Sequence, residues 1–437
     1  MVRPGERLSL AHTLSYAAPG VAIKALTLPL IAYLPPLYAS LPGLSLATVG
    51  VVFMLARMWD IFTDPIAGAI MDRSRPPLGR RKFWIALATP ALMATVWPLF
   101  NPPQTANAIH LGGLLFLFYV AWTLLTIAHA AWPADLTPDS GDRTRLIAWR
   151  EWAGVLGMVA VLAAPILVLG GGAPLEQQLR TMGGLLLLVA PLTIVPSLVI
   201  LPRLETQDQK SKPDLSGAWR LIQESPPMRR LLTSDLLSGC AYAANSATSF
   251  FIMSQYLSVG EHYSAIMLCF MLAMILGIPA FLKLSLWKGP QFSFALAMIG
   301  AAAASIGFAF APAGNVLAAM ALNAALGFCT GGYQFNLNTE MVRLADNDRQ
   351  TSGQDRVSLH LALLAMTNKL GYALAVGVVY LLLQSFSGAQ GAKVELSPFA
   401  LVGLGLATPA ALFLGAAWTL RANGLRSEKQ EVPLKSG

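Results

Sequence analysis

Two aspartates, Asp60 and Asp64, stand one helical turn apart inside a stretch that is otherwise apolar. A carboxylate at membrane depth is costly and is rarely retained without a function. At positions i and i+4 the two side chains project from the same face of a helix, so their oxygens can converge on one cation or share one proton. We therefore predict that Asp60 and Asp64 bind a coupling ion, either Na⁺ or H⁺, and that the chain needs no other metal or cofactor.

Composition predicts that these aspartates lie in a membrane protein. Of the 437 residues, 55% are hydrophobic and only 12% are charged, about half the charged fraction of an average soluble domain. The formal net charge is +8, but the basic residues lie in short loops, which argues against a nucleic-acid partner. Cys240, Cys269 and Cys329 fall in apolar stretches without metal-ligand spacing, so we expect no disulfide and no metal cluster.

A window of about 20 apolar residues divides the chain into about twelve candidate spans in two sets of six. We therefore expect an all-α membrane protein with two six-helix bundles, at residues 1–201 and 231–421, a cytoplasmic linker at 202–230 and a cytoplasmic tail at 422–437. This architecture is typical of secondary transporters, whose substrate site lies near the midplane. The predicted spans are 10–38, 43–71, 83–100, 108–133, 145–171, 180–201, 231–257, 261–287, 290–311, 314–342, 357–385 and 397–420.

Lysine and arginine gather in alternate loops. The intervening loops, such as residues 101–105, are nearly free of them. By the positive-inside rule both termini and the linker face the cytoplasm of a bacterial inner or plasma membrane. The basic residues that give this pattern are Arg73, Arg75, Arg80, Arg81, Lys82, Arg143, Arg145, Arg203, Lys210, Lys212, Lys283, Lys288, Arg349, Arg356, Arg421 and Arg426.

The second span and the loop after it resemble a known family signature. The run from Ala56 to Arg73, followed by Gly79, Arg80 and Arg81, is similar to that of the glycoside-pentoside-hexuronide cation symporters, the melibiose-permease-like branch of the major facilitator superfamily. The resemblance implies a cation-coupled symporter that works by alternating access. Further matches are Leu136, Thr137, Pro138, Asp139, Asp142, Arg143, Arg150, Asp346, Thr351, Ser352, Gly353, Arg356 and Lys369.

The resemblance also implies site residues. Asp60, Asp64 and Thr123 stand at the family's cation site, and Thr63 replaces its asparagine with another oxygen donor. The two aspartates that hold a neutral sugar in the melibiose permease are replaced by Lys24 and Thr126, and Arg150 and Lys369 match residues that face the central cavity. The resulting excess of cations favours an acidic substrate, such as a uronide or another acidic glycoside.

Three interpretations of Lys24 remain open. It lies about 14 residues into its helix, roughly 21 Å from the cytoplasmic start, so it cannot snorkel to that interface. It can bind a substrate anion together with Arg150 and Lys369, it can pair with Asp60 or Asp64 in place of the cation, or it can form a structural ion pair. Arg150 has a similar alternative, since Glu151 is its neighbour.

The remaining candidates also have structural alternatives. Tyr333 and Gln334 stand near the family's sugar-stacking aromatic, although packing alone explains them as well. We expect Asp72, Arg73, Arg80 and Arg81 to form a cytoplasmic gate, in which guanidinium groups pair with Asp72 or with helix-ending carbonyls; the alternative is that they only set topology. His129 is expected to be a hydrogen-bonded packing residue.

We expect no enzyme activity, because no phosphate-binding loop, metal cluster or nucleophile motif is present. A first alternative to sugar symport is the transport of a lysophospholipid or another amphiphilic anion, since animal lysophospholipid symporters resemble the same family. A second is a membrane receptor or assembly factor that does not transport. The expected partners are a small anionic substrate and membrane lipids, and the chain is expected to be a monomer.

Overall fold

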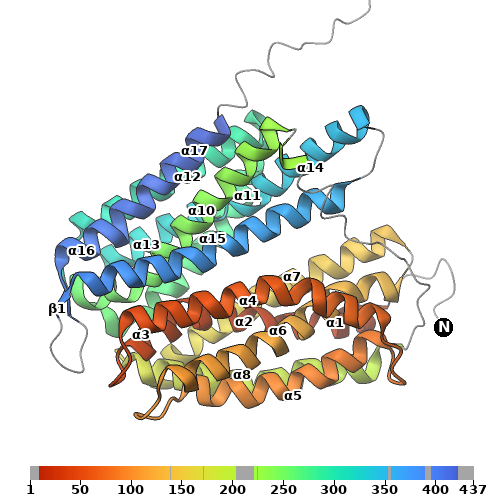
Figure 1. The fold of residues 1–437 in the computed structure, drawn as a ribbon, viewed down its shortest axis with the longest axis horizontal. Coiled ribbons are helices and arrows are strands. Elements are labelled where there is room, and N and C mark those ends of the chain that lie inside the picture. The colour runs from red at the N-terminus through yellow and green to blue at the C-terminus, as the bar shows by residue number, and fades with distance from the viewer. Residues whose placement is uncertain are drawn as a thin grey trace, which may run out of the picture. The chain divides into compact units, whose positions relative to one another are not determined.

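The computed structural model describes residues 9–137, 139–170, 172–202, 221–223, 225–352, 356–388 and 395–421. The predicted tail and most of the predicted linker lie outside these residues. Helices make up nearly all of the described chain (Figure 1). Two short strands, β1 (Ser387–Gly388) and β2 (Glu395–Leu396), pair antiparallel before the last helices.

The first predicted span is a broken helix. It consists of α1 (Leu10–Ala17), α2 (Pro19–Ala25), a π-helical turn (Pro29–Tyr33) and α3 (Leu34–Ala39). Proline lacks the backbone N–H that continues an α-helix, and Pro19 and Pro29 each begin a new segment. The break between α1 and α2 precedes Lys24, which lies in the last turn of α2.

Three of the next five helices have a side-chain cap at their N-terminus. Ser45, Asn107 and Asp139 each accept a hydrogen bond from a backbone N–H of the first turn of the helix that follows, as N-caps do. The helices are α4 (Leu46–Arg73), α5 (Arg80–Phe100), α6 (Ala108–Leu136), α7 (Ser140–Leu169) and α8 (Leu175–Ile200).

The second half of the chain is also helical, and its tenth predicted span is divided. Helices α13 (Val316–Thr330) and α14 (Gln334–Ser352) are separated by the turn at Gly331, Gly332 and Tyr333. The other elements are α10 (Pro226–Phe251), a π-helical turn (Ile252–Tyr256), a 3₁₀ turn (Gly260–His262), α11 (Tyr263–Lys288), α12 (Pro290–Gly307), a 3₁₀ turn (Phe308–Phe310), α15 (Val357–Ser385), α16 (Pro398–Val402), a π-helical turn (Gly403–Ala407) and α17 (Thr408–Arg421).

Among the described residues, eleven helices are long and apolar enough to cross a membrane. They coincide with eleven of the predicted spans. The remaining predicted span, 231–257, corresponds to α10, which has 26 residues and a length of about 39 Å at 1.5 Å per residue. The polar side chains of α10, and not its length, distinguish it from the eleven other helices. The prediction of an all-α, multi-span fold is confirmed.

The chain forms two compact units. The first contains residues 1–210, 249–268 and 377–397; the second contains residues 211–248, 269–376 and 398–437. Segments of the second half of the sequence thus pack within the first unit. There the Tyr33 hydroxyl donates to the Ser264 hydroxyl at 3.3 Å, and the Ser264 hydroxyl donates to the Gln178 amide oxygen at 2.6 Å.

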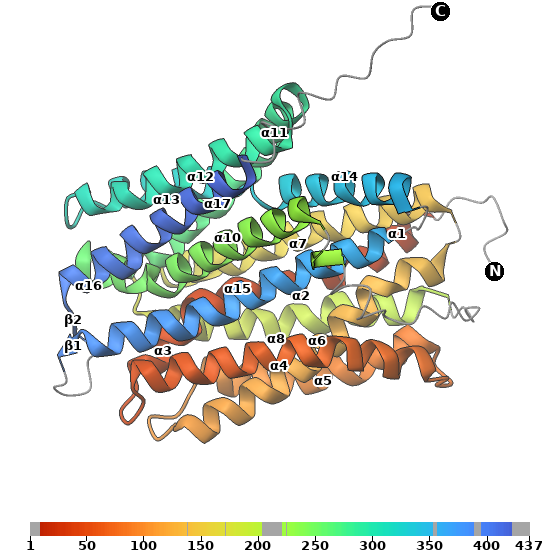
Figure 2. The same cartoon turned by 45° about the horizontal axis from the view of Figure 1, so that its top comes forward.

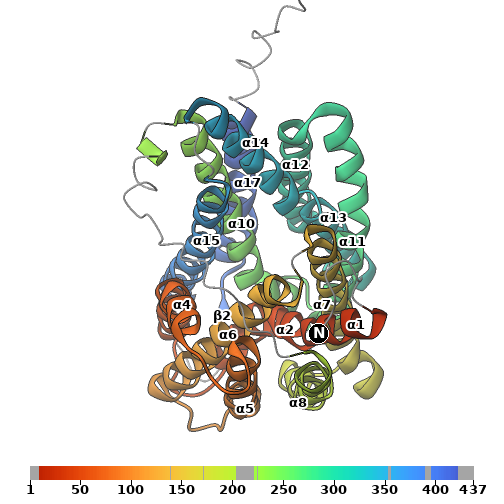
Figure 3. The same ribbon diagram turned by 90° about the vertical axis from the view of Figure 1, so that its right-hand side faces the viewer.

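Each unit has its own helix packing. In the first unit, α6 packs against α4 and α5, and α2 packs against α7 and α8, which can be followed in Figure 3. In the second unit, α12 packs against α13 and α17 (Figure 2). The helix pairs α4 with α6 and α2 with α7 carry most of the predicted site residues of the first unit.

Glycines bring α2 and α7 close together. A Cβ on Gly157 would overlap the backbone carbonyl of Val21, and a Cβ on Gly20 would lie 2.7 Å from the carbonyl oxygen of Arg150. Both contacts are shorter than side-chain atoms tolerate, so the two helices can pack at this distance only with glycine at these positions. Such small-residue interfaces are common between membrane helices.

We expect Gly157→Ala to lower the midpoint of thermal unfolding of the detergent-purified protein, because the added methyl must push α2 from α7. Overpacking of this kind typically costs about 1–3 kcal/mol. Gly184→Ala is the matched control, since a Cβ at Gly184 on α8 meets nothing within 4 Å. An equal effect of both substitutions on the unfolding midpoint would contradict the close-packing explanation.

Candidate functional site

Asp60 is a buried carboxylate in the middle of α4. Its side chain is 2% exposed, and the Thr123 hydroxyl on α6, 1% exposed, donates to Asp60 Oδ1 at 2.7 Å. A short hydrogen bond to a carboxylate oxygen is a strong one. The structure therefore brings together two of the residues that the family resemblance assigns to the cation site.

The contact between Asp60 and Thr123 follows from parallel packing of α4 and α6. Toward the N-terminal side of this contact the Arg57 guanidinium lies 5.8 Å from the ring centre of Tyr119. The residue numbers of the contacting pairs therefore increase in the same direction along both helices. Parallel packing of this kind is expected for the second and fourth spans of a chain that crosses the membrane back and forth. One more turn along α4 brings Asp64, which is half-buried and on the same helical face as Asp60.

Thr63 follows Asp60 by three residues on α4, and its predicted place in the cation site stays a prediction. Its hydroxyl donates to the backbone oxygen of Asp60 at 3.2 Å, so it is used within its own helix. Among the described residues no group of three or more His, Cys, Asp or Glu side chains lies together. A Na⁺ ion at this place would draw on the carboxylates of Asp60 and Asp64 and on hydroxyl or carbonyl oxygens, with Thr123 the nearest. Hard cations accept such a mixed oxygen set.

Lys24 lies beside Glu151, not beside the α4 carboxylates. Its ammonium nitrogen is 3.5 Å from Glu151 Oε2, and the Arg150 guanidinium is 2.8 Å from Glu151 Oε1. The structure thus shows Lys24 in an ion pair, with a partner that the sequence had suggested only for Arg150, and its contact with substrate stays a prediction. The Lys24 and Glu151 side chains are 44% and 48% exposed, so the pair remains open to a ligand.

The cluster of Lys24, Arg150 and Glu151 carries an excess of positive charge. Two cations flank one carboxylate, which leaves a formal charge of +1 (+2 − 1). Gly154 makes room for this arrangement, because a Cβ there would lie 2.5 Å from Lys24 Cγ. A residual positive charge that remains accessible favours binding of an anion.

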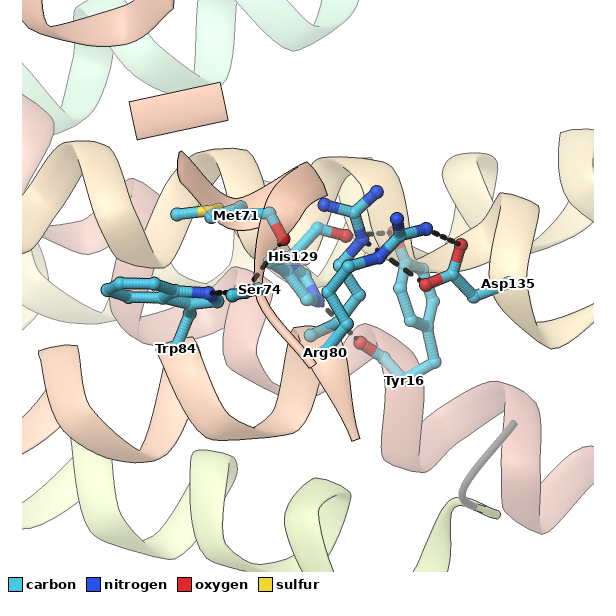
Figure 4. Close-up of polar contacts among 8 residues, drawn as sticks. Tyr16, Met71, Ser74, Arg80, Trp84, His129 and Asp135 are labelled. Atoms are coloured by element: carbon cyan, nitrogen blue, oxygen red, sulfur yellow. Dashed lines mark hydrogen bonds and ion pairs between the residues drawn. The ribbon is translucent and has the colours of Figure 1, made fainter. Parts of the chain in front are cut away.

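Tyr16 and His129 support the buried side of this cluster. Tyr16 lies near Arg150, and its hydroxyl donates to the backbone oxygen of His129 at 3.1 Å. His129 Nε2 in turn lies 2.8 Å from the backbone oxygen of Tyr16 (Figure 4). His129 is 2% exposed, which agrees with its expected role as a packing residue.

Thr126 offers little to a ligand in this structure. Its hydroxyl donates to the backbone oxygen of Trp122 at 2.8 Å, within α6. A threonine bonded in this way still presents its methyl group and its oxygen lone pairs, but its proton is engaged. Its predicted substrate contact therefore stays a prediction.

The predicted substrate residues of the second unit are Tyr333, Gln334 and Lys369. Tyr333 is 5% exposed, its ring contacts that of Tyr242 at a centroid distance of 5.0 Å, and its hydroxyl donates to Asp235 Oδ1 at 2.9 Å. A ring enclosed in this way offers no stacking platform, so the packing alternative describes Tyr333 in this structure. Gln334 is exposed and Lys369 is half-buried.

The arginines of the predicted cytoplasmic gate converge on a carboxylate that sequence reasoning missed. Arg80 lies 3.7 Å from Asp135 Oδ1 and Arg81 lies 3.2 Å from Asp135 Oδ2, near the end of α6 (Figure 4). The side chain of Asp72, the expected partner, lies outside the described residues. Arg73 is exposed.

The turn between α4 and α5 is also held to the helices that flank it. The Ser74 hydroxyl donates to the backbone oxygen of Met71 at 2.8 Å and accepts from Trp84 Nε1 at 2.9 Å (Figure 4). Lys82 donates to the backbone oxygens of Leu198 and Leu201 at the end of α8. Lys82 thus binds helix-ending carbonyls, in addition to any effect on topology.

Sequence signals existed for the residues that were missed. Asp235 lies inside a predicted span, so the criterion that identified Asp60 would also have identified it. Asp135 precedes a loop and resembles an ordinary interfacial residue, and only the fold shows that two arginines meet there. Glu151 could be assigned to Arg150 from adjacency, but its contact with Lys24 depends on the packing of α2 against α7.

Known proteins resemble the chain over different lengths. A protein of Escherichia coli strain K12 named for glycoside/cation symport is 28% identical over 37% of this chain and 35% of its own length. A protein of Salmonella typhimurium named for sulfoquinovose import is 29% identical over 29% of this chain and 28% of its own length. The sodium-dependent lysophosphatidylcholine symporter 1 of Mus musculus is 28% identical over 35% of this chain and 30% of its own length. The matched segments thus span about a third of each relative.

The fold and the family extend over nearly the whole chain. The crystal structure of the nucleoside transporter NupG superposes with a TM-score of 0.65, covering 97% of this chain and 99% of that one at 14% identity, and so shows the same fold. The model of the family described as MFS/sugar transport protein matches residues 15–423. The chain therefore belongs to the MFS/sugar transport protein family and is a multi-pass membrane transport protein.

Proposed function

We propose that the protein is a cation-coupled symporter that carries an anionic sugar derivative, such as an acidic glycoside or uronide, by alternating access. The observation that carries this proposal is the buried contact between Asp60 and Thr123 in the middle of α4 and α6. A carboxylate in this position, with Asp64 one turn away, provides a place for Na⁺ or H⁺. Names of relatives that refer to cation or sodium symport support ion coupling.

Coupling follows from linkage between two binding events. An ion at Asp60 and Asp64 neutralises charge in the first unit and favours the state that binds substrate. By thermodynamic reciprocity, substrate then tightens ion binding by the same factor. Substrate and ion are thereby carried together, and neither of them crosses efficiently alone.

The accessible positive charge at Lys24 and Arg150 supports an acidic substrate. Glu151 compensates one of the two cations, and the remaining charge can be met by a carboxylate or sulfonate on the substrate. The relative named for sulfoquinovose import is consistent with a sulfonated sugar as one member of this class. Lys369 in the second unit is proposed to contribute to the same preference.

The remaining parts of the proposal concern placement in the cell. The distribution of lysine and arginine supports cytoplasmic termini and a cytoplasmic linker. The membrane is proposed to be the inner or plasma membrane of a bacterium, and the chain is proposed to act as a monomer.

We assign the contacts of Arg80 and Arg81 with Asp135 to the cytoplasmic gate region. Asp72 and Arg73, at the end of α4, belong to the same proposed region.

A lysophospholipid symporter is the second candidate. The resemblance to the mouse lysophosphatidylcholine symporter favours it, and a phosphate-bearing headgroup would be recognised by the same cations. The two candidates differ in whether the substrate carries an acyl chain.

Asp60→Asn is expected to reduce ion-driven accumulation of substrate in proteoliposomes strongly while leaving the protein folded, because asparagine keeps the shape of the side chain but lacks the negative charge that attracts a cation and cannot exchange a proton. Uptake would be measured with separate Na⁺ and H⁺ gradients, and a fall of about tenfold or more is expected, which corresponds to about 1.4 kcal/mol. Full gradient-driven accumulation by this variant would exclude Asp60 as the coupling site.

Thr123→Val should weaken the response to the coupling ion on the order of tenfold, because the hydroxyl that contacts Asp60 is lost. Thr123→Ser should retain the response. Thr193→Val on α8 is the matched control, because the described hydrogen bonds of the Thr193 hydroxyl go to the backbone of its own helix. The ion concentration that gives half-maximal uptake separates these variants, and equal values for Thr123→Val and Thr193→Val would contradict the assignment.

Lys24→Gln should reduce uptake of acidic substrates relative to neutral ones, and Lys24→Arg should preserve the preference. A suitable panel contains a glucuronide, a sulfonated sugar, a neutral glycoside and lysophosphatidylcholine. We expect the acidic-to-neutral ratio to fall on the order of tenfold, equivalent to about 1.4 kcal/mol. An unchanged ratio would refute charge recognition by Lys24, transport of lysophosphatidylcholine alone would favour the second candidate, and transport of none of them would favour a receptor or assembly role.

A further inference from the structure

The second unit contains a buried carboxylate that the proposed function does not use. Asp235 lies nine residues into α10, about 14 Å from its start at 1.5 Å per residue, and its side chain is 0% exposed. Oδ1 accepts hydrogen bonds from the Tyr333 hydroxyl at 2.9 Å and from Asn368 Nδ2 at 3.4 Å. Oδ2 is buried and has no hydrogen-bond partner among the described residues.

The residues around Asp235 come from three helical segments. Tyr333 lies in the turn between α13 and α14, and Asn368 lies on α15 and also donates to the Tyr333 hydroxyl at 2.7 Å. Close packing of α10 and α15 places them there, since a Cβ on Gly371 would lie 3.0 Å from the Leu236 carbonyl oxygen. The arrangement is therefore built by the fold and does not depend on one flexible side chain.

No cation compensates Asp235 within the described part of the second unit. Its described hydrogen-bond donors, Tyr333 and Asn368, are neutral. The other titratable groups nearby are Cys240, five residues further on α10, Tyr242, whose ring contacts that of Tyr333, and Tyr372, one turn beyond Asn368 on α15. Lys369 follows Asn368 in the sequence, yet no described ion pair joins it to Asp235.

We propose that Asp235, Tyr333 and Asn368 form a proton-binding site in the second unit, with Asp235 Oδ2 as the atom that takes the proton. A buried carboxylate charge without a cation is far more costly than a buried neutral carboxyl group. One proton on Oδ2 removes the charge and leaves both hydrogen bonds to Oδ1 in place. This site is separate from Asp60 and Asp64 and does not require them.

Infrared difference spectroscopy of the purified, full-length protein tests this proposal without a substrate. A protonated carboxyl group gives its own C=O stretch, which disappears when the proton leaves. We expect a pH series to show a band that is present in the wild type and in the Asp60→Asn/Asp64→Asn double variant and is lost in Asp235→Asn. Glu176→Gln, which changes an exposed carboxylate at the start of α8, is the matched control and should keep the band.

Tyr333→Phe keeps the carboxyl group and removes one hydrogen bond to it, so the band should remain but move in frequency. This variant tests the site even when Asp235→Asn does not fold. A spectrum that is the same in wild type and Asp235→Asn at every pH, or a band whose frequency Tyr333→Phe leaves unchanged, would overturn the proposal. Loss of the band only in the Asp60→Asn/Asp64→Asn variant would also overturn it, while leaving the proposed coupling site intact.

Discussion

The hydrogen bond from Thr123 to Asp60 is the contact on which the candidate cation site depends. It forms because α4 and α6 run parallel and in a register that also brings Arg57 to Tyr119. A shift of one turn, about 5.4 Å along the axis, would separate the Thr123 hydroxyl from the Asp60 carboxylate, and an unsatisfied polar group at this depth is costly. The register of these two helices and the chemistry of the site therefore constrain each other.

Small residues make the cluster of Lys24, Arg150 and Glu151 possible. Gly154 leaves space for the stem of Lys24, and Gly20 and Gly157 let α2 approach the backbone of α7. Only at this distance does Lys24 reach Glu151, while Arg150 on the same helix reaches it from the adjacent position. Replacing any of these glycines should thus disturb charge recognition as well as stability.

The sequence was sufficient for the helices and for singling out Asp60, because hydropathy, capping residues and a carboxylate in an apolar run are local signals. Thr123 carries no such signal and was identified only through the family resemblance, and the structure places its hydroxyl on Asp60. Local signals could not show that Lys24 meets Glu151 or that Arg80 and Arg81 meet Asp135, since these contacts join residues far apart in the chain. Tyr333 shows the opposite difficulty: its position suggested a ligand platform, yet neighbouring helices enclose it.

The partners of Glu151, which is half exposed, and of Asp235, which is buried, explain which of these carboxylates can exchange an ion. Glu151 is held by two cations, so releasing or protonating it would leave both of them uncompensated in the membrane, which is unfavourable. Asp235 is held among the described residues by a hydroxyl and an amide, and it can gain or lose a proton without breaking an ion pair. The permanent positive charge that selects an anion is therefore assigned to the two cations beside Glu151. The charge that changes when a proton binds or leaves is assigned to Asp235.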